Sequence, residues 1–176
     1  MSMNEKTIAL FGTGKEPSGG SVWRLAYETG RVLAAAGFVI VNGGYDGTML
    51  AAAKGASEAG GQTIGVTCSA FGRAGANKYV KREVVTHSLD ERLDTLIRLG
   101  QGYVVLPGGT GTLLELAKVW ELKNKGFMAE HKPIILVGGF WQPLIDLITA
   151  EDQQSGRHIE QAESPEHVRD ILTRYF

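Results

Sequence analysis

The chain has 176 residues, which suits one domain over residues 1–176 with a core between layers of secondary structure. Its 18 basic and 19 acidic residues nearly cancel, so the chain has no net positive charge that would attract a polyanion, and we expect no nucleic-acid partner. Residues 1–6 lack the apolar core of a secretory signal, and no apolar run approaches the roughly 18 residues of a membrane span, so we expect a cytoplasmic protein without membrane attachment.

Apolar runs alternate with helical patterns along the chain, and many of the 24 glycines stand where those runs end. In chain order we expect a strand at 7–11, a helix at 21–36, a strand at 38–41, a helix at 47–59, a strand at 63–66, a loop at 68–81, a strand at 83–86, a helix at 88–100, a strand at 102–106, a helix at 112–125, a strand at 133–137, and helices at 143–149 and from 165. Ser164 before Pro165 is a favourable start for the last helix.

The strands are rich in Val, Ile and Leu without polar alternation, and helices separate them. This pattern is typical of a parallel sheet covered on both faces. We therefore predict an α/β, doubly wound, mostly parallel sheet in a Rossmann-like three-layer sandwich. Ligands bind such sheets beyond the carboxyl ends of the strands, where the Gly-rich loops of this chain are expected.

Several familiar motifs fail on inspection. Gly12 and Gly14 begin a dinucleotide-binding pattern, but Pro17 stands at the third glycine. Glu16 replaces the Ser or Thr of a phosphate-binding P-loop. The single Cys68 cannot form an internal disulfide, and the four histidines show no paired metal-ligand spacing, so we expect no metal site.

The loop at residues 107–112, with the sequence PGGTGT, follows a buried strand and precedes a helix. Its glycines let the backbone approach an anion, and the free N–H groups of the helix start point at it. A tight turn without a ligand would also explain the glycines, but the threonine hydroxyls add donors and favour phosphate. The predicted phosphate-binding residues are Gly108, Gly109, Thr110, Gly111 and Thr112, with Gly12, Thr13, Gly43, Gly44, Gly47 and Thr48 in the earlier loops.

Glu115 and Arg92 are the candidate catalytic residues. Glu115 completes a possible capping box with Thr112, but it also falls between Val119 and Leu122 on an almost wholly apolar helix, which favours a semi-buried cleft. Arg92 projects from within the apolar arc of its helix, so its charge needs a partner, either in a core ion pair or in a ligand. A second capping box joins Ser88 to Glu91.

The string PGGTGTLLE at residues 107–115 resembles the P-G-G-x-G-T-x-x-E signature of the LOG family, often labelled lysine decarboxylase-like. Residues 43–49 are similar to that family's second Gly-rich loop, and Arg92 stands at the distance of its active-site arginine. The resemblance implies a phosphoribohydrolase, which cleaves the N-glycosidic bond of a nucleoside 5'-monophosphate, such as a cytokinin riboside monophosphate, to free base and ribose 5-phosphate. It also implies a homodimer, no metal or redox cofactor, and a phosphate held by residues 109–112. In that family pattern Glu115 would act at the ribose, and Arg92 would orient the substrate and balance charge.

The chain differs from the family pattern at Asn42, at Leu89-Asp90 and at Leu93, so base recognition is expected to differ. A competing interpretation is a non-catalytic nucleotide or cofactor carrier on the same fold, because a phosphate loop does not establish turnover. Asp46 could belong to the site or stabilise a turn. Glu121 could belong to the site or be an acidic residue on the surface of its helix.

Overall fold

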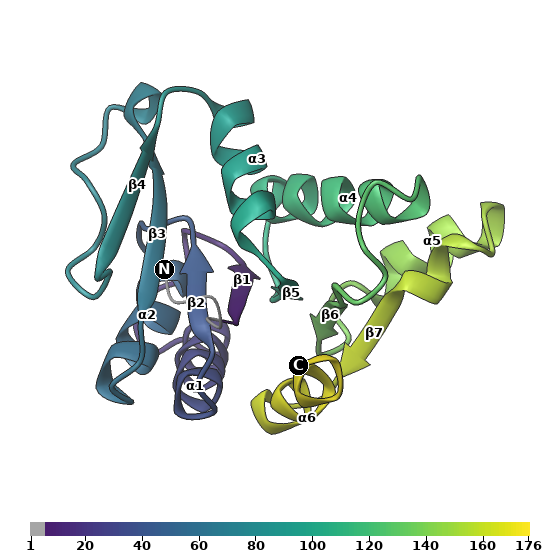
Figure 1. Cartoon of the computed structure of the whole chain (residues 1–176), viewed down its shortest axis with the longest axis horizontal. Helices are drawn as coiled ribbons and strands as arrows, with labels where there is room; N and C mark the ends of the chain where they lie inside the picture. The colour runs from purple at the N-terminus through teal and green to yellow at the C-terminus, as the bar shows by residue number, and fades with distance from the viewer. Residues whose placement is uncertain (1–5) are drawn as a thin grey trace.

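The computed structural model describes residues 6–176, in which strands and helices alternate (Figure 1). The strands are β1 (Thr7–Phe11), β2 (Val39–Asn42), β3 (Thr63–Cys68), β4 (Arg82–Thr86), β5 (Gly102–Val105), β6 (Ile134–Val137) and β7 (Ile159–Ala162). The helices are α1 (Ser21–Ala35), α2 (Thr48–Glu58), α3 (Leu89–Leu99), α4 (Thr110–Asn124), α5 (Gln142–Glu151) and α6 (Pro165–Tyr175), with short 3-10 turns at Ser69–Phe71 and Ser155–His158. Residues 1–5, which entered the prediction about a secretory signal, lie outside the described part.

The strands form one sheet in the order β4-β3-β2-β1-β5-β6-β7, and every pairing is parallel. From β1 the chain builds outward to β4, then returns to the other side of β1 to add β5, β6 and β7. The strand order therefore reverses between β1 and β5, where Leu10 lies opposite Val104. The predicted doubly wound parallel fold is confirmed, and its switch point marks the expected ligand edge.

Helices cover both faces of the sheet (Figure 1). On one face α3, α4 and α5 bury residues such as Leu96, Leu116 and Ile145 against the sheet. On the other face α1, α2 and α6 do the same with residues such as Leu33, Ala52 and Ile171. The central strands are thus buried on both faces, which explains why apolar and polar residues do not alternate along their sequences.

Three differences between the predicted and the observed elements stand out. Strand β7 was not predicted, because Ile159–Ala162 is a short edge strand with polar residues at its centre. The 3-10 turn Ser69–Phe71 lies within the predicted loop. Helix α4 begins at Thr110, two residues before the predicted start, and this shift changes the interpretation of Glu115 below.

The predicted helix starts at Ser88 and Ser164 are confirmed. The Ser88 hydroxyl accepts a hydrogen bond from Glu91 N at 3.1 Å, and the Ser164 hydroxyl accepts one from His167 N at 3.1 Å. The return bond of the first capping box goes one residue further back, because the Glu91 carboxylate accepts from His87 N at 2.8 Å. This bond orients the start of α3, the helix that carries Arg92.

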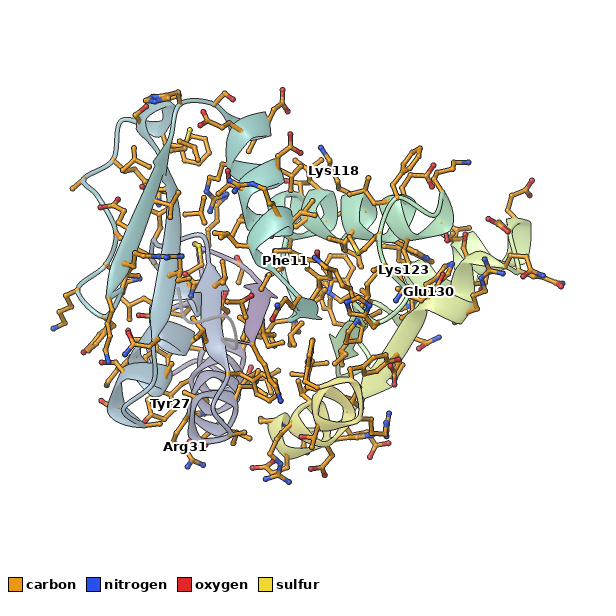
Figure 2. The ribbon with its side chains drawn as sticks, viewed as in Figure 1. Phe11, Tyr27, Arg31, Lys118, Lys123 and Glu130 are labelled. Carbon is orange, nitrogen blue, oxygen red and sulfur yellow. The ribbon has the colours of Figure 1, made fainter. Side chains whose placement is uncertain are left out.

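The far end of α4 is fixed by a buried lysine, labelled in Figure 2. Lys123 Nζ donates hydrogen bonds to the carbonyls of Glu130 at 3.0 Å and Lys132 at 2.7 Å, and burial lowers the pKa of its ammonium group. These bonds tie the segment between α4 and β6 to the helix. No helix within residues 6–176 is long and apolar enough to cross a membrane.

Candidate functional site

A cavity of about 590 Å³ opens at the carboxyl edge of the sheet, around the switch point between β1 and β5. The lining residues come from the segments after β1, β2, β3 and β5 and from the helices α2, α3 and α4. Its lining consists of residues 12–15 after β1, Tyr45 and Met49 after β2, Phe71 and Arg73 after β3, Leu89 and Arg92 on α3, and residues 109–112 with Glu115 on α4. The fold thus brings together the predicted phosphate loop, Arg92 and Glu115.

The start of α4 forms one wall of this cavity. Gly109 is the N-cap residue and makes no side-chain capping bond, because glycine has no side chain. The N–H groups of the first helical turn therefore have no capping side chain, and with the helix dipole they favour an anion there. Thr110 and Thr112 lie in that turn and line the cavity.

The proposed capping box between Thr112 and Glu115 is wrong. Because Gly109 is the N-cap, Thr112 stands at the third helical position and Glu115 in the second turn. A carboxylate there is beyond the reach of the N-cap N–H group. Glu115 instead points into the cavity, where its side chain is only 13% exposed.

Burial determines the charge of Glu115. Removal of its carboxyl group from water raises its pKa from 4.5 to about 7, although the nearby Arg92 guanidinium acts in the opposite direction. Near neutral pH this group exists in both protonation states. A carboxyl group with such a pKa beside a cavity is typical of general acid–base chemistry.

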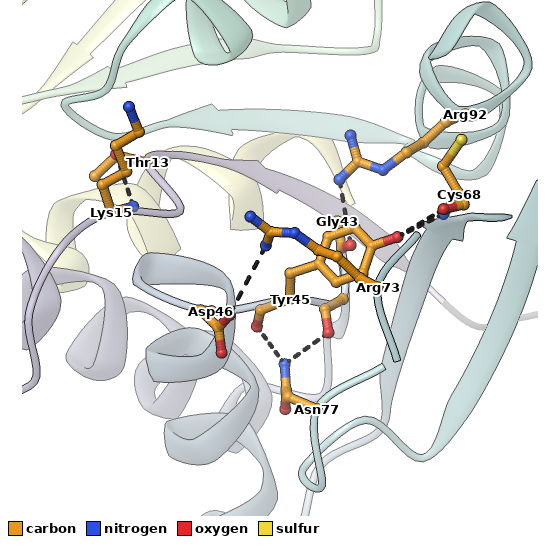
Figure 3. A network of polar contacts seen from close by, with 10 residues as sticks. Thr13, Lys15, Gly43, Tyr45, Asp46, Cys68, Arg73, Asn77 and Arg92 are labelled. Carbon is orange, nitrogen blue, oxygen red and sulfur yellow. Dashed lines mark hydrogen bonds and ion pairs between the residues drawn. The ribbon is translucent and has the colours of Figure 1, made fainter. Parts of the chain in front are cut away.

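Arg92 faces Glu115 across the cavity from α3. Its Nη1 lies 4.0 Å from Glu115 Oε1, its Nε donates to Val66 O at 2.8 Å, and its Nη2 donates to Gly43 O at 3.2 Å. Figure 3 shows the guanidinium reaching the carbonyl of Gly43. Strand β3 and the loop after β2 thus fix the arginine. The Arg92 charge, unusual in the apolar arc of α3, has protein partners and also faces the cavity, where a ligand can reach it.

The second Gly-rich loop supports the site from behind the lining residues. Thr48 donates from both its N and its Oγ1 to Thr13 O at 2.9 Å, which holds the loop after β1 in place. Gly44 and Gly47 have φ values of 78° and 62°, which disfavour any other residue. The predicted ligand residues Gly43, Gly44, Gly47 and Thr48 lie outside the cavity lining.

Two further glycines make room for threonines. A Cβ atom on Gly108 would collide with the Thr112 side chain, and one on Gly12 would come within 2.5 Å of Thr48 Oγ1. Gly12 lines the cavity with Thr13, whereas Gly108 lies behind Thr112. The Asn42 side chain, which departs from the family pattern, donates to Met49 O at 2.9 Å and accepts from Gly44 N at 2.8 Å, so it holds the loop.

The other half of the lining was not among the predicted site residues, although Tyr45 and Met49 belong to the second Gly-rich loop and Leu89 departs from the family pattern. This half comprises Gly14, Lys15, Tyr45, Met49, Phe71, Arg73 and Leu89. Phe71 and Arg73 belong to the predicted loop, whose lack of periodicity gave no sign of a role. The 42% exposure of Phe71 and the 47% exposure of Leu89 are explained by their position at the cavity.

Asp46 and Glu121 lie outside the lining of this cavity. Asp46 forms an exposed 3.8 Å ion pair with Arg73, and Glu121 pairs at 3.6 Å with Lys125 on the surface of α4. Cys68 is buried at the end of β3. No group of three His, Cys, Asp or Glu side chains within residues 6–176 could hold a metal ion.

Known proteins resemble this chain over most of its length. A cytokinin riboside 5'-monophosphate phosphoribohydrolase of Mycobacterium tuberculosis is 33% identical over 142 residues, which are 74% of this chain and 70% of the relative. The solved structure of the molybdenum cofactor binding protein of Rippkaea orientalis matches with a TM-score of 0.81 and 26% identity over 98% of both chains. The molybdenum cofactor carrier protein of Chlamydomonas reinhardtii matches with a TM-score of 0.78 and 26% identity, again over 98% of both chains.

These similarities confirm the LOG resemblance found in the sequence and the α/β fold described above. The model of the SLOG cluster4 family matches residues 5–169. The chain therefore belongs to the SLOG cluster4 family.

Proposed function

We propose that this protein is a phosphoribohydrolase that cleaves the N-glycosidic bond of a nucleoside 5'-monophosphate and releases free base and ribose 5-phosphate. The observation that carries the proposal is the buried Glu115 carboxyl group, with a pKa of about 7, facing Arg92 in the cavity beside the start of α4. The relative from Mycobacterium tuberculosis, named as a phosphoribohydrolase, supports it.

The phosphate is expected at the start of α4. The N–H groups of residues 110–112 and the hydroxyls of Thr110 and Thr112 offer donors on the cavity side, and the helix dipole favours the negative charge. Lys15 on the opposite loop adds a positive charge to the same cavity. A phosphate bound there would place the ribose beside the second turn of α4, where Glu115 stands.

The chemistry follows from this placement. As the C–N bond of the nucleotide breaks, positive charge develops on the ribose, and the ionised Glu115 carboxylate stabilises it. A water molecule forms the new C–O bond, Glu115 accepts the proton that this water loses, and the same proton is then passed to the departing base. Arg92, held by two backbone carbonyls, keeps part of the Glu115 population ionised and orients the ribose.

A second candidate function is a non-catalytic carrier of a nucleotide or a phosphorylated cofactor. The observation in its favour is the match of both molybdenum cofactor binding and carrier structures over 98% of the chain. A carrier needs the anion-binding start of α4, but it does not need a buried acid facing an arginine. The Glu115–Arg92 pair therefore favours the hydrolase.

The test is release of free base from a panel of purine and pyrimidine nucleoside 5'-monophosphates. We expect release by the wild type and a loss of about 100-fold or more in kcat for Glu115→Gln. Glu121→Gln is the matched control, because Glu121 is an exposed acid on the same helix. Calorimetric binding of a nucleotide without base release from any member of the panel would instead support the carrier.

We also infer that the protein acts as a homodimer, as the family resemblance implies. Apolar side chains exposed on α4 and α5 support this inference, with Leu114 at 42%, Leu147 at 69% and Ile148 at 38% exposure. Light scattering after size-exclusion chromatography measures the mass directly. A monomer at micromolar concentration would contradict the inference.

A further inference from the structure

The cavity extends well beyond the start of α4, where the phosphate is expected. Its lining follows the sheet edge from the loop after β5, across β1 and β2, to the segment after β3. Neighbouring strands lie about 4.8 Å apart, so this path covers roughly 14 Å. If the phosphate lies at the start of α4, as the proposed function requires, the base of the nucleotide lies over β2 and β3.

This end of the cavity has aromatic and apolar walls. The ring of Phe71 lies 6.1 Å from the buried ring of Tyr45, and the exposed side chain of Leu89 lines the same space. Flat apolar surfaces of this kind suit the faces of a base. They do not distinguish one base from another, because every base has such a face.

Two arginines lie at this end of the cavity. The Arg92 guanidinium is 5.7 Å from the ring centroids of both Tyr45 and Phe71. Arg73 enters from the segment after β3. The Arg73 guanidinium lies across the ring of Tyr45, 5.2 Å from the ring centroid (Figure 3). Its ion pair with Asp46 is long, at 3.8 Å, and its side chain is 54% exposed. Among residues 6–176 its one ion-pair partner is Asp46, so the remaining N–H groups of the guanidinium are available to a ligand.

The segment that carries Arg73 is anchored to the loop after β2. Asn77 Nδ2 donates to Gly44 O at 3.0 Å and to Tyr45 O at 2.8 Å, and Asn77 N donates to Gly44 O at 2.8 Å. Glu83 Oε1 accepts from Ala76 N at 2.9 Å and from Thr67 Oγ1 at 2.6 Å. These bonds fix the backbone on which Arg73 stands close to the cavity.

A guanidinium group has five donors and no acceptor. The Hoogsteen edge of guanine or hypoxanthine offers two acceptors, O6 and N7, which a guanidinium can bind in a bidentate manner. Adenine presents an amino donor in place of O6. We propose that Arg73 is a specificity-determining residue that selects 6-oxopurine nucleotides over 6-aminopurine nucleotides.

The test compares inosine and adenosine 5'-monophosphates, whose purine rings differ at the 6-position. We expect the wild type to favour the inosine nucleotide in kcat/KM on the order of 10-fold. Arg73→Met is expected to bring this ratio close to one, and Arg73→Lys to retain part of it. Arg82→Met is the matched control, since Arg82 is exposed on β4 outside the cavity lining.

Calorimetry on Glu115→Gln, with and without Arg73→Met, measures the same preference without turnover. Base release with a ratio that Arg73→Met leaves unchanged would overturn the role of Arg73 and leave the hydrolase intact. Binding with an inosine preference that Arg73→Met abolishes, but no release by the wild type from either nucleotide, would support Arg73 and overturn the hydrolase. Absence of both binding and release would overturn both proposals.

Discussion

The Arg92 guanidinium lies 4.0 Å from the Glu115 carboxylate, and the two residues come from neighbouring helices on the same face of the sheet. Burial outweighs the attraction of the arginine and holds the pKa of Glu115 at about 7. The carboxyl group therefore changes its charge in the range where most cellular enzymes act. This relationship makes the site testable by pH as well as by mutation.

The rate of base release should depend on the ionisation of Glu115. We expect kcat/KM to rise with pH through about 7 and then level off, because the carboxylate is the active form. Initial rates between pH 5 and 9 with saturating and limiting nucleotide provide the measurement. A Glu115→Gln protein that kept the same pH profile would contradict the role of this residue.

Arg92→Leu should shift the pH dependence of kcat/KM to higher pH. The arginine lowers the pKa of Glu115, so its removal raises that pKa further, and the rise in kcat/KM should occur at a higher pH than in the wild type. We also expect about a 10-fold or larger loss at the plateau, since the ribose loses an orienting group. Arg98→Leu, on the exposed side of α3, should leave the profile where it is.

Glu115 should also make stability depend on pH. Its pKa rises from 4.5 to about 7 on folding, so its stabilising contribution is full below pH 4.5 and is lost as the pH increases through 7. Relative to Glu115→Gln, the wild type should lose at most on the order of 3 kcal/mol of unfolding free energy over this range. Urea denaturation of both proteins at pH 4.5, 6 and 8 measures the difference. If the unfolding free energy of the two proteins depended on pH in the same way, the burial of the Glu115 carboxyl group would be contradicted.

Thr112→Val should weaken phosphate recognition selectively. The substitution removes a hydroxyl at the start of α4 but keeps the shape of a side chain that is only 3% exposed. We expect KM for a nucleoside 5'-monophosphate to rise by roughly 5- to 10-fold, while the affinity for the corresponding nucleoside stays the same. Thr173→Val on α6, where the hydroxyl donates to Arg169 O, is the control. An equal loss of affinity for nucleoside and nucleotide would place the phosphate elsewhere.

Gly47→Ala should destabilise the protein more than Gly60→Ala. Both glycines have positive φ, at 62° and 77°, which costs an alanine about 1 kcal/mol in the left-handed helical region. Gly47, with ψ of −128°, lies outside that region, where the cost to an alanine is higher. A Cβ atom on Gly60 meets nothing within 4 Å, whereas one on Gly47 would come within 2.5 Å of Thr13 O. We therefore expect an additional loss of about 1 to 3 kcal/mol for Gly47→Ala, measured by urea denaturation. Equal losses for the two variants would show that the loop after β1 can move away.

The order of strands and helices could be predicted from the sequence because buried parallel strands are continuous apolar runs and glycines mark their ends. Residues 107–115 could be identified as a candidate site for the same reason, since a strand, a Gly-rich loop and the helix start follow one another directly in the chain. The position of Glu115 on an apolar helix also indicated its burial, which the 13% exposure of its side chain confirms. The edge strand β7 was missed because its sequence is short and partly polar, so its pattern of apolar and polar residues does not differ from that of a loop.

Only the tertiary structure decided which residues meet across the cavity. Arg92 reaches Gly43 and Val66 from a helix far along the chain, and no spacing in the sequence encodes those bonds. Phe71 and Arg73 enter the site because parallel strands bring the segment after β3 to the same edge as the loop after β5. The pKa of Glu115 likewise depends on the water that these packed segments exclude, a property of the assembled fold that local sequence does not determine.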